Sequence, residues 1–164
     1  MGKVKLKTPS PFNSPFELGI RMVYLLTNLF PRGADLQKLI LLDYAAIYSG
    51  DFGGPNSLHT PVPYRNAELY GRRNTVRSGL KLMATKRLVD VHLGDDGITY
   101  FAGDNARALV DSLGAPYLFD LAERCNWVTS IYGDVETIEL TDKFHELGSR
   151  WEAEMDSSVN RFET

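Results

Sequence analysis

The sequence predicts a mainly helical α+β fold, built on a winged helix-turn-helix core with a β-hairpin wing and additional C-terminal helices. Three observations in residues 69–101 carry this prediction. Apolar residues recur at spacings of three, four or seven, as on one face of a helix: Leu69, Val76, Leu80 and Met83. From residue 88 to residue 101, apolar and polar residues alternate around a Gly-Asp-Asp-Gly turn, which is typical of a β-hairpin. A helix over about residues 66–86 that leads directly into a hairpin is the C-terminal half of a winged helix-turn-helix.

The expected helix is strongly basic. Residues 69–87 hold six of the chain's 18 Lys and Arg residues and no Asp or Glu. If the apolar positions face the core, the four-residue spacing of Arg73, Arg77 and Lys81 places them along one exposed ridge, with Arg72 beside it. We predict that these four residues bind DNA, mainly through its phosphates. A contact with acidic residues of a partner protein and a merely solvated face are the two alternatives.

Two helices with little polar surface are expected before this stretch, at about residues 15–30 and 35–49. The Asn-Ser-Pro sequence at residues 13–15 is a capping residue followed by proline, which is typical of a helix start. Asp43 is the lone carboxylate in the apolar run of the second helix. We interpret it as a surface charge or a hydrogen-bonding partner of a nearby loop rather than a catalytic group.

Two further segments are expected to lie outside regular helices. Residues 50–66 form a loop rich in Gly and Pro, and its 58–62 segment could supply a third strand to the sheet of the wing. His59 is the only imidazole of this loop, and we interpret it as solvated or backbone-bonded rather than as a ligand or catalytic group. Residues 1–12 are expected to form an arm, either a solvated terminus or a strand added to a partner's sheet.

The C-terminal part is predicted to consist of short helices followed by a polar helix. We expect helices at about residues 104–113 and 117–131, a β-like run at 135–140, and a helix from Thr141, as its N-cap, to about Met155. The last helix carries an apolar seam at spacings of three and four: Phe144, Leu147, Trp151 and Met155. We predict that this seam docks on the body of the protein or binds a partner.

Length and charge indicate one domain with appendages. We predict an N-terminal arm at residues 1–12, a winged-helix domain with a helical extension at 13–133, and an acidic, helical tail at 134–164. Residues 1–133 carry a net charge of +3 and residues 134–164 one of −6, which together give the chain's −3. A mildly basic body with an acidic tail is typical of a protein that meets other macromolecules.

Several functional classes are disfavoured by composition and motifs. The single cysteine, Cys125, excludes an internal disulfide and a cysteine-based zinc site, and its helical spacing places it in the core. The three histidines lie in different expected elements, and no hydrolase, metalloprotease or phosphate-loop motif is present. Neither a signal peptide nor an apolar run long enough for a bilayer is visible. We therefore expect a soluble cytoplasmic protein that is not an enzyme, needs no cofactor or metal, and does not contact a membrane.

Longer strings of the sequence carry a family resemblance. They are FNSPFELGIRMVYLL, then LQKLILLDYAAIYSGDFGGPNSLHTPVPYRNAELYGRRNTVRSGLKLM, then the pair RLVDV and GITYFAG. Over about residues 12–128 the chain resembles the small middle component of bacterial ABC three-component defence systems, in particular the small subunit of Lamassu-type antiphage systems. The resemblance implies an accessory subunit with a winged-helix core, which assembles with an SMC-like or Rad50-like ABC ATPase and an effector, often a nuclease. It brings no catalytic residues with it.

Two functional hypotheses from different classes follow. One is an adaptor subunit of a defence complex, and the other is a stand-alone winged-helix transcription regulator. A regulator would usually be a symmetric dimer that binds a palindrome. The long loop at residues 50–66 and the extra C-terminal helices favour the adaptor. Adjacent genes for an ATPase and a nuclease would discriminate the two.

Overall fold

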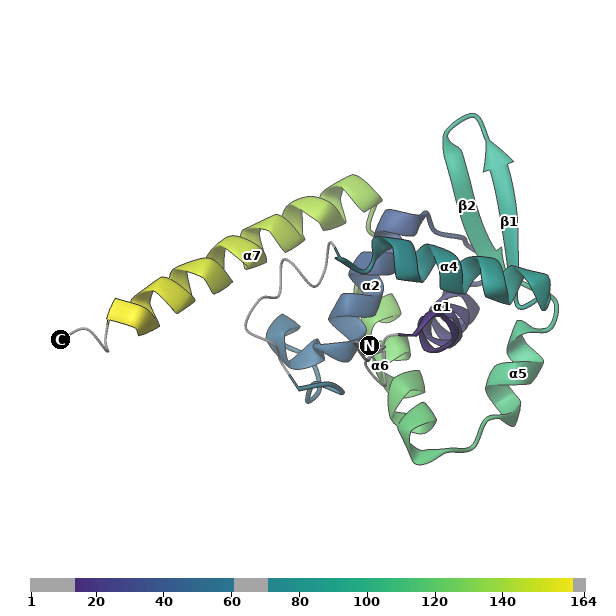
Figure 1. Ribbon diagram of the computed structural model, residues 1–164, viewed down its shortest axis with the longest axis horizontal. Coiled ribbons are helices and arrows are strands. Elements are labelled where there is room, and N and C mark those ends of the chain that lie inside the picture. The colour runs from purple at the N-terminus through teal and green to yellow at the C-terminus, as the bar shows by residue number, and fades with distance from the viewer. Residues whose placement is uncertain (1–13, 61–70, 161–164) are drawn as a thin grey trace, which may run out of the picture.

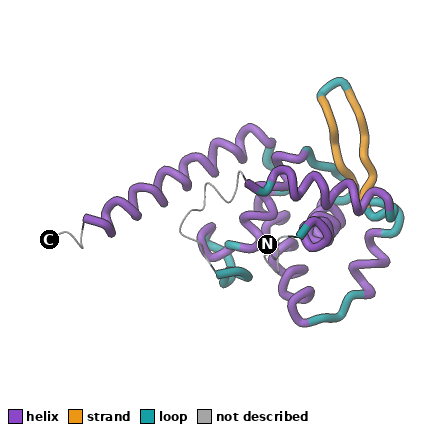
Figure 2. Tube along the Cα trace, in the orientation of Figure 1, coloured by secondary structure: helices purple, strands orange, loops and turns teal. Residues whose placement is uncertain are grey.

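The computed structural model describes the backbone of residues 14–60 and 71–160 of the chain. Side chains are described up to residue 149. These residues form a mainly helical fold with one two-stranded antiparallel β-hairpin, in agreement with the predicted α+β class (Figures 1 and 2). The elements, in chain order, are α1 (Pro15–Leu29), α2 (Leu36–Ile47), the 3-10 helix η1 (Ser49–Phe52), α4 (Arg73–Thr85), β1 (Val89–Gly94), β2 (Gly97–Ala102), α5 (Ala106–Ser112), α6 (Pro116–Tyr132) and α7 (Thr137–Asn160).

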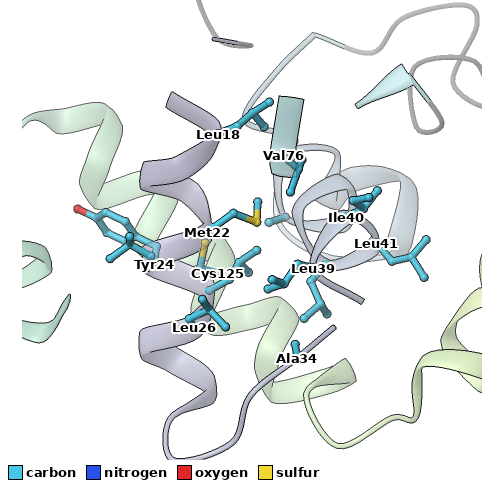
Figure 3. Packing of buried hydrophobic residues seen from close by; sticks show 14 of the residues in the cluster. Leu18, Met22, Tyr24, Leu26, Ala34, Leu39, Ile40, Leu41, Val76 and Cys125 are labelled. Carbon is cyan, nitrogen blue, oxygen red and sulfur yellow. The ribbon is translucent and has the colours of Figure 1, made fainter. Parts of the chain in front are cut away.

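Helix α1 is the central helix of the fold. Its start is the predicted one: the Ser14 side chain accepts a hydrogen bond from the backbone N–H of Glu17 at 3.2 Å, and Pro15 occupies the first turn. Helices α2, α4, α5 and α6 all contact α1, so nearly every face of it is buried. Figure 3 shows part of this core, with Cys125 of α6 fully buried in it as the sequence predicted. The apolar composition of α1 follows from this central position.

Helices α1 and α4 cross at a point where both present a glycine. A Cβ atom added to Gly79 of α4 would lie 2.6 Å from the Pro15 carbonyl oxygen and 2.7 Å from the Gly19 nitrogen. A Cβ atom added to Gly19 would lie 2.8 Å from the Gly79 carbonyl oxygen. The two backbones therefore approach more closely than any side chain at these positions would permit. The position of α4 against the core is set by this contact.

The hairpin follows α4 directly, and a residue between α1 and α2 joins its sheet. Strands β1 and β2 pair in register from Val89 opposite Ala102 to Gly94 opposite Gly97. On the other side of β2, Ala34 forms a bridge with Tyr100 through two backbone hydrogen bonds of 2.8 and 2.9 Å. The third-strand expectation for residues 58–62 is therefore wrong where residues are described, because the backbone of Leu58 bonds to the end of α2 instead. Residues 61 and 62 lie outside the described part.

The C-terminal region differs from its prediction at one boundary. The segment expected to be a β-like run, residues 135–140, already contains the first turn of α7. Thr141 is not an N-cap: its hydroxyl donates a 2.8 Å hydrogen bond back to the Thr137 carbonyl inside the helix. The β-branched residues of this segment favour a strand locally, but Leu140 and Phe144 are four apart and both buried, which is the spacing of one helix face.

Candidate functional site

The basic ridge of α4 has the orientation that the sequence predicted. The side chains of Val76, Leu80 and Met83 are completely buried against the core, whereas those of Arg73, Arg77 and Lys81 are exposed. We call these three residues the α4 ridge. A helix turns by about 100° per residue, so residues four apart form one row along its surface. The ridge therefore presents three positive charges in a line.

The side chains of the α4 ridge form few interactions within the chain that would compete with the binding of a ligand. Among the described residues, none of its three side chains forms an ion pair, and the Arg73 guanidinium only donates a long 3.5 Å hydrogen bond to the Gln37 side chain. Helix α4 contains no acidic residue. Beyond its end, Lys86 and Arg87 are also exposed and extend the positive surface toward the hairpin. The result is a basic surface without internal neutralisation in the part of the chain that is described.

Arg72 does not belong to this surface, although the sequence grouped it with the ridge. Its side chain is only 5% exposed and its Nη1 atom lies 3.0 Å from Oδ2 of Asp43. The guanidinium also lies 5.8 Å from the ring centroids of both Tyr44 and Tyr48, in cation–π geometry. Arg72 therefore anchors the start of α4 to α2 and is not available to DNA phosphates in this structure.

Asp43 is the centre of a buried ion cluster. Its carboxylate accepts two hydrogen bonds from Arg21 of α1, at 2.7 Å from Nε and 3.0 Å from Nη2, in addition to the one from Arg72. Asp43 is 1% exposed, so the surface-charge interpretation is wrong. Its partners are Arg21 on α1 and Arg72, the turn residue that caps the start of α4, so it is a hydrogen-bonding partner of a non-helical position as well as of a helix. The cluster joins α1, α2 and the start of α4. Asp43 and Arg21 were each a charge inside an apolar helix, and this was the signal in the sequence that could have revealed the pair.

Burial and ion pairing shift the pKa values of Asp43 and Arg21 in opposite directions. Burial by itself would raise the pKa of Asp43, but the charge and hydrogen bonds of Arg21 and the charge of Arg72 bring the pKa below its usual value. Burial would likewise lower the pKa of Arg21, and Asp43 raises it above its usual value instead. Asp43 and Arg21 are therefore both charged in the folded protein, and each stabilises the charged form of the other.

His59 is half-buried at the edge of the same region. Its Nε2 atom lies 2.8 Å from the hydroxyl of Tyr117, and the two rings are stacked with centroids 6.1 Å apart. Its backbone N–H donates to the carbonyl of Ile47. The imidazole thus joins the loop after η1 to α6, a side-chain contact that spacing in the sequence does not reveal. No metal-binding group of three or more His, Cys, Asp or Glu residues is found in the described ranges.

The predicted seam of α7 is divided between two situations. Phe144 is 5% exposed, and its ring lies 4.9 Å from that of Phe52 and 6.4 Å from that of Tyr44. Leu147 is half-buried. The seam thus begins on the body of this chain, one of the two outcomes left open by the sequence. Trp151 and Met155 lie in α7, and their side chains are outside the described part.

The described features define a class of protein: it is mainly helical, and its surface presents a basic helix and a projecting hairpin. The part of the chain that the structure describes contains no helix with the length and apolar character needed to cross a membrane. A family model, that of the ABC-three component (ABC-3C) system Middle Component 2, matches residues 11–154. The chain belongs to this family, and is thus one component of a system that has others. Neither a curated protein nor a solved structure shows significant similarity to it.

Proposed function

We propose that this chain is a non-catalytic adaptor subunit of an antiphage defence complex, of the Lamassu type. In this proposal it bridges an SMC-like or Rad50-like ABC ATPase and an effector, often a nuclease. Its membership in a middle-component family supports a role among partner proteins. We further propose that the adaptor contacts DNA within the assembled complex, and the exposed, acid-free α4 ridge is the observation that carries this part of the proposal.

The order of elements supports a winged-helix core for the adaptor. The chain passes from α1 through the bridging residue Ala34 to α2, and later from α4 through β1 to β2. A winged helix-turn-helix has this order, with a short strand between its first two helices and its third helix followed by the wing. In that architecture the third helix corresponds to α4, which is the helix that enters the major groove in DNA-binding members.

The α4 ridge is suited to phosphates rather than to reading base sequence. Arg73, Arg77 and Lys81 follow one row along the helix, which matches a charged backbone better than a set of base edges. Phosphate contacts provide affinity that is independent of sequence and falls steeply with salt. A complex that responds to foreign DNA by its ends or shape needs this type of affinity.

Charge reversal of the ridge tests the proposal. The triple variant Arg73→Glu, Arg77→Glu and Lys81→Glu is compared with a control that reverses two exposed charges away from α4, Arg32→Glu and Lys143→Glu. Both are co-expressed with the other components of the system, and DNA binding of the purified complex is titrated at several salt concentrations. If all three residues contact phosphates, the slope of log K against log salt becomes shallower by about 2–3 units in the triple variant. The control keeps the wild-type slope.

Three results contradict parts of the proposal. If the triple-variant complex assembles and its DNA affinity is unchanged, the α4 ridge does not bind DNA. Loss of assembly in the triple variant alone assigns the ridge to an acidic protein surface instead. A wild-type chain that forms a symmetric dimer on a palindrome, and binds no other component, supports the stand-alone winged-helix transcription regulator.

A further inference from the structure

One face of the β-hairpin is apolar over its whole length but buried over only half of it. The register places Val91 opposite Tyr100 and Leu93 opposite Ile98, so these side chains share a face with Val89. At the base of the hairpin, Val89 and Tyr100 are 2% and 7% exposed. Toward the turn, Val91, Leu93 and Ile98 are 44%, 82% and 47% exposed. We call these last three residues the hairpin face.

The body of the protein does not reach the hairpin face. Figure 1 shows the hairpin projecting away from the helices from a base near the C-terminal end of α4. On the opposite side, Asp90 is paired with Phe101 at the base, where the Phe101 ring lies 4.6 Å from that of His92, and the half toward the turn carries His92 and Thr99. Toward the turn the two strands therefore alternate as a half-buried antiparallel pair does. Such a pattern is expected where one face is covered. In this hairpin, the body of the protein covers the apolar face only at the base, and the apolar residues continue toward the turn.

The charges around the hairpin face indicate the kind of partner that covers it. Residues 88–106 contain four Asp and neither Lys nor Arg, in contrast to the acid-free basic segment 69–87 that precedes them. Two of these acids, Asp95 and Asp96, are exposed at the turn, next to Leu93 and Ile98. A negatively charged, apolar tip repels phosphates. It complements a protein surface that is apolar and bordered by Lys or Arg.

We propose that the hairpin face docks into an apolar groove, bordered by basic residues, on another protein component of the same system. This inference rests on the proposed adaptor function and adds the surface by which the adaptor holds a protein partner. Leu93 and Ile98 enter the groove as a cross-strand pair, and Asp95 and Asp96 meet the basic border. The partner therefore contacts a different surface from the one assigned to DNA.

A double variant in the full chain tests this inference. Leu93→Ser with Ile98→Ser removes the apolar pair, and both side chains are exposed enough for the fold to tolerate the change. The matched control is Ile138→Ser, which alters an isoleucine that is 80% exposed on α7. Each chain is titrated with the separately purified other components of the system, and its thermal unfolding is recorded. We expect at least tenfold weaker binding to one component for the double variant, with unchanged unfolding, and no effect of the control.

A second variant tests the charged border independently of the apolar pair. Asp95→Lys with Asp96→Lys is expected to weaken binding to the same component and to remove part of its salt dependence. Because both residues lie exposed at the turn, this variant also serves if the double serine variant does not fold.

The outcomes separate this inference from the function on which it rests. A wild-type chain that binds no other component overturns both. A wild-type chain that binds a component, together with hairpin variants that bind it equally well, overturns only the hairpin proposal. Loss of DNA binding with intact protein assembly assigns the face to nucleic acid and overturns the proposal. A wild-type homodimer that the serine variant converts to a monomer identifies a second copy as the occupant, which overturns it as well.

Discussion

Replacing Asp43 with alanine is expected to destabilise the fold strongly. The change removes the carboxylate that accepts hydrogen bonds from both Arg21 and Arg72 in the buried cluster. The two guanidinium groups are 3% and 5% exposed, so water cannot take the place of the lost carboxylate without opening the core. The variant therefore keeps two buried cations whose shared counter-charge is gone.

The size of this effect follows from the burial of the cluster. Removing one partner of a buried ion pair costs about 3–5 kcal/mol of unfolding free energy, because an uncompensated charge remains. For a chain of 164 residues, each kcal/mol lowers the melting temperature by about 2–4 °C, so a loss of about 6–20 °C is expected. Replacing Arg72 with methionine should cost less, because Asp43 keeps both hydrogen bonds from Arg21.

Chemical denaturation of a small set of variants provides the measurement. The control is Glu139→Ala, which breaks a half-exposed pair with Lys143 on α7 and should cost no more than about 0.5 kcal/mol. Adding Arg21→Met to Asp43→Ala should restore part of the lost stability, because it removes one of the uncompensated charges. A loss below about 1 kcal/mol for Asp43→Ala, or full additivity of the two changes, refutes the description of the cluster as a mutually dependent unit.

Three further outcomes are expected from the same structure. The folded-state pKa of Asp43 lies below its unfolded value of about 3.9. The ionised carboxylate therefore adds fully to the free energy of unfolding above that pH, and this contribution is lost as the pH falls. The stability difference between wild type and Asp43→Asn should shrink below about pH 4, as measured by acid titration monitored by circular dichroism. Gly79→Val should destabilise by at least about 1–3 kcal/mol in urea denaturation, because its Cβ meets the backbone of α1, whereas Gly71→Ala has open space around it and should be nearly neutral. Phe144→Ala should cost about 3–5 kcal/mol in the same assay if its buried ring holds α7 on the body, and Ile138→Ala, at 80% exposure, should not.

The features that the sequence predicted are those encoded by neighbouring residues. The buried face of α4 and its exposed ridge follow from helical spacing, and the hairpin follows from alternation around a Gly-Asp-Asp-Gly turn. The burial of Arg72 could not be predicted in this way, because it depends on Asp43, 29 positions earlier in the chain and on another helix. The spacing of residues in the sequence shows on which face of its own helix a residue lies. It does not show which charged residue of another element lies next to that face.

The same distinction explains the error about the third strand. The sequence Leu-His-Thr-Pro-Val at residues 58–62 was compatible with a short strand, whereas the bridge to β2 is made by Ala34, which has no strand signal of its own. Its pairing with Tyr100 arises from the position of the turn between α1 and α2 beside the hairpin. A single bridging residue is specified by packing of the surrounding elements, and its own sequence contributes little.

In the proposed function, the change of charge sign between α4 and the hairpin separates the DNA contact of the chain from its protein contact. Both surfaces have fixed positions, since α4 is set against α1 by the Gly19–Gly79 contact and its first turn is anchored through Arg72 to Asp43. The three cations of the α4 ridge attract a phosphate backbone, and the acidic turn of the hairpin repels phosphates that would extend from the ridge toward it. Conversely, an apolar groove with a basic border is drawn to the hairpin and repelled by the ridge. The two proposed contacts therefore also differ in their response to salt, which weakens phosphate binding steeply and apolar burial little.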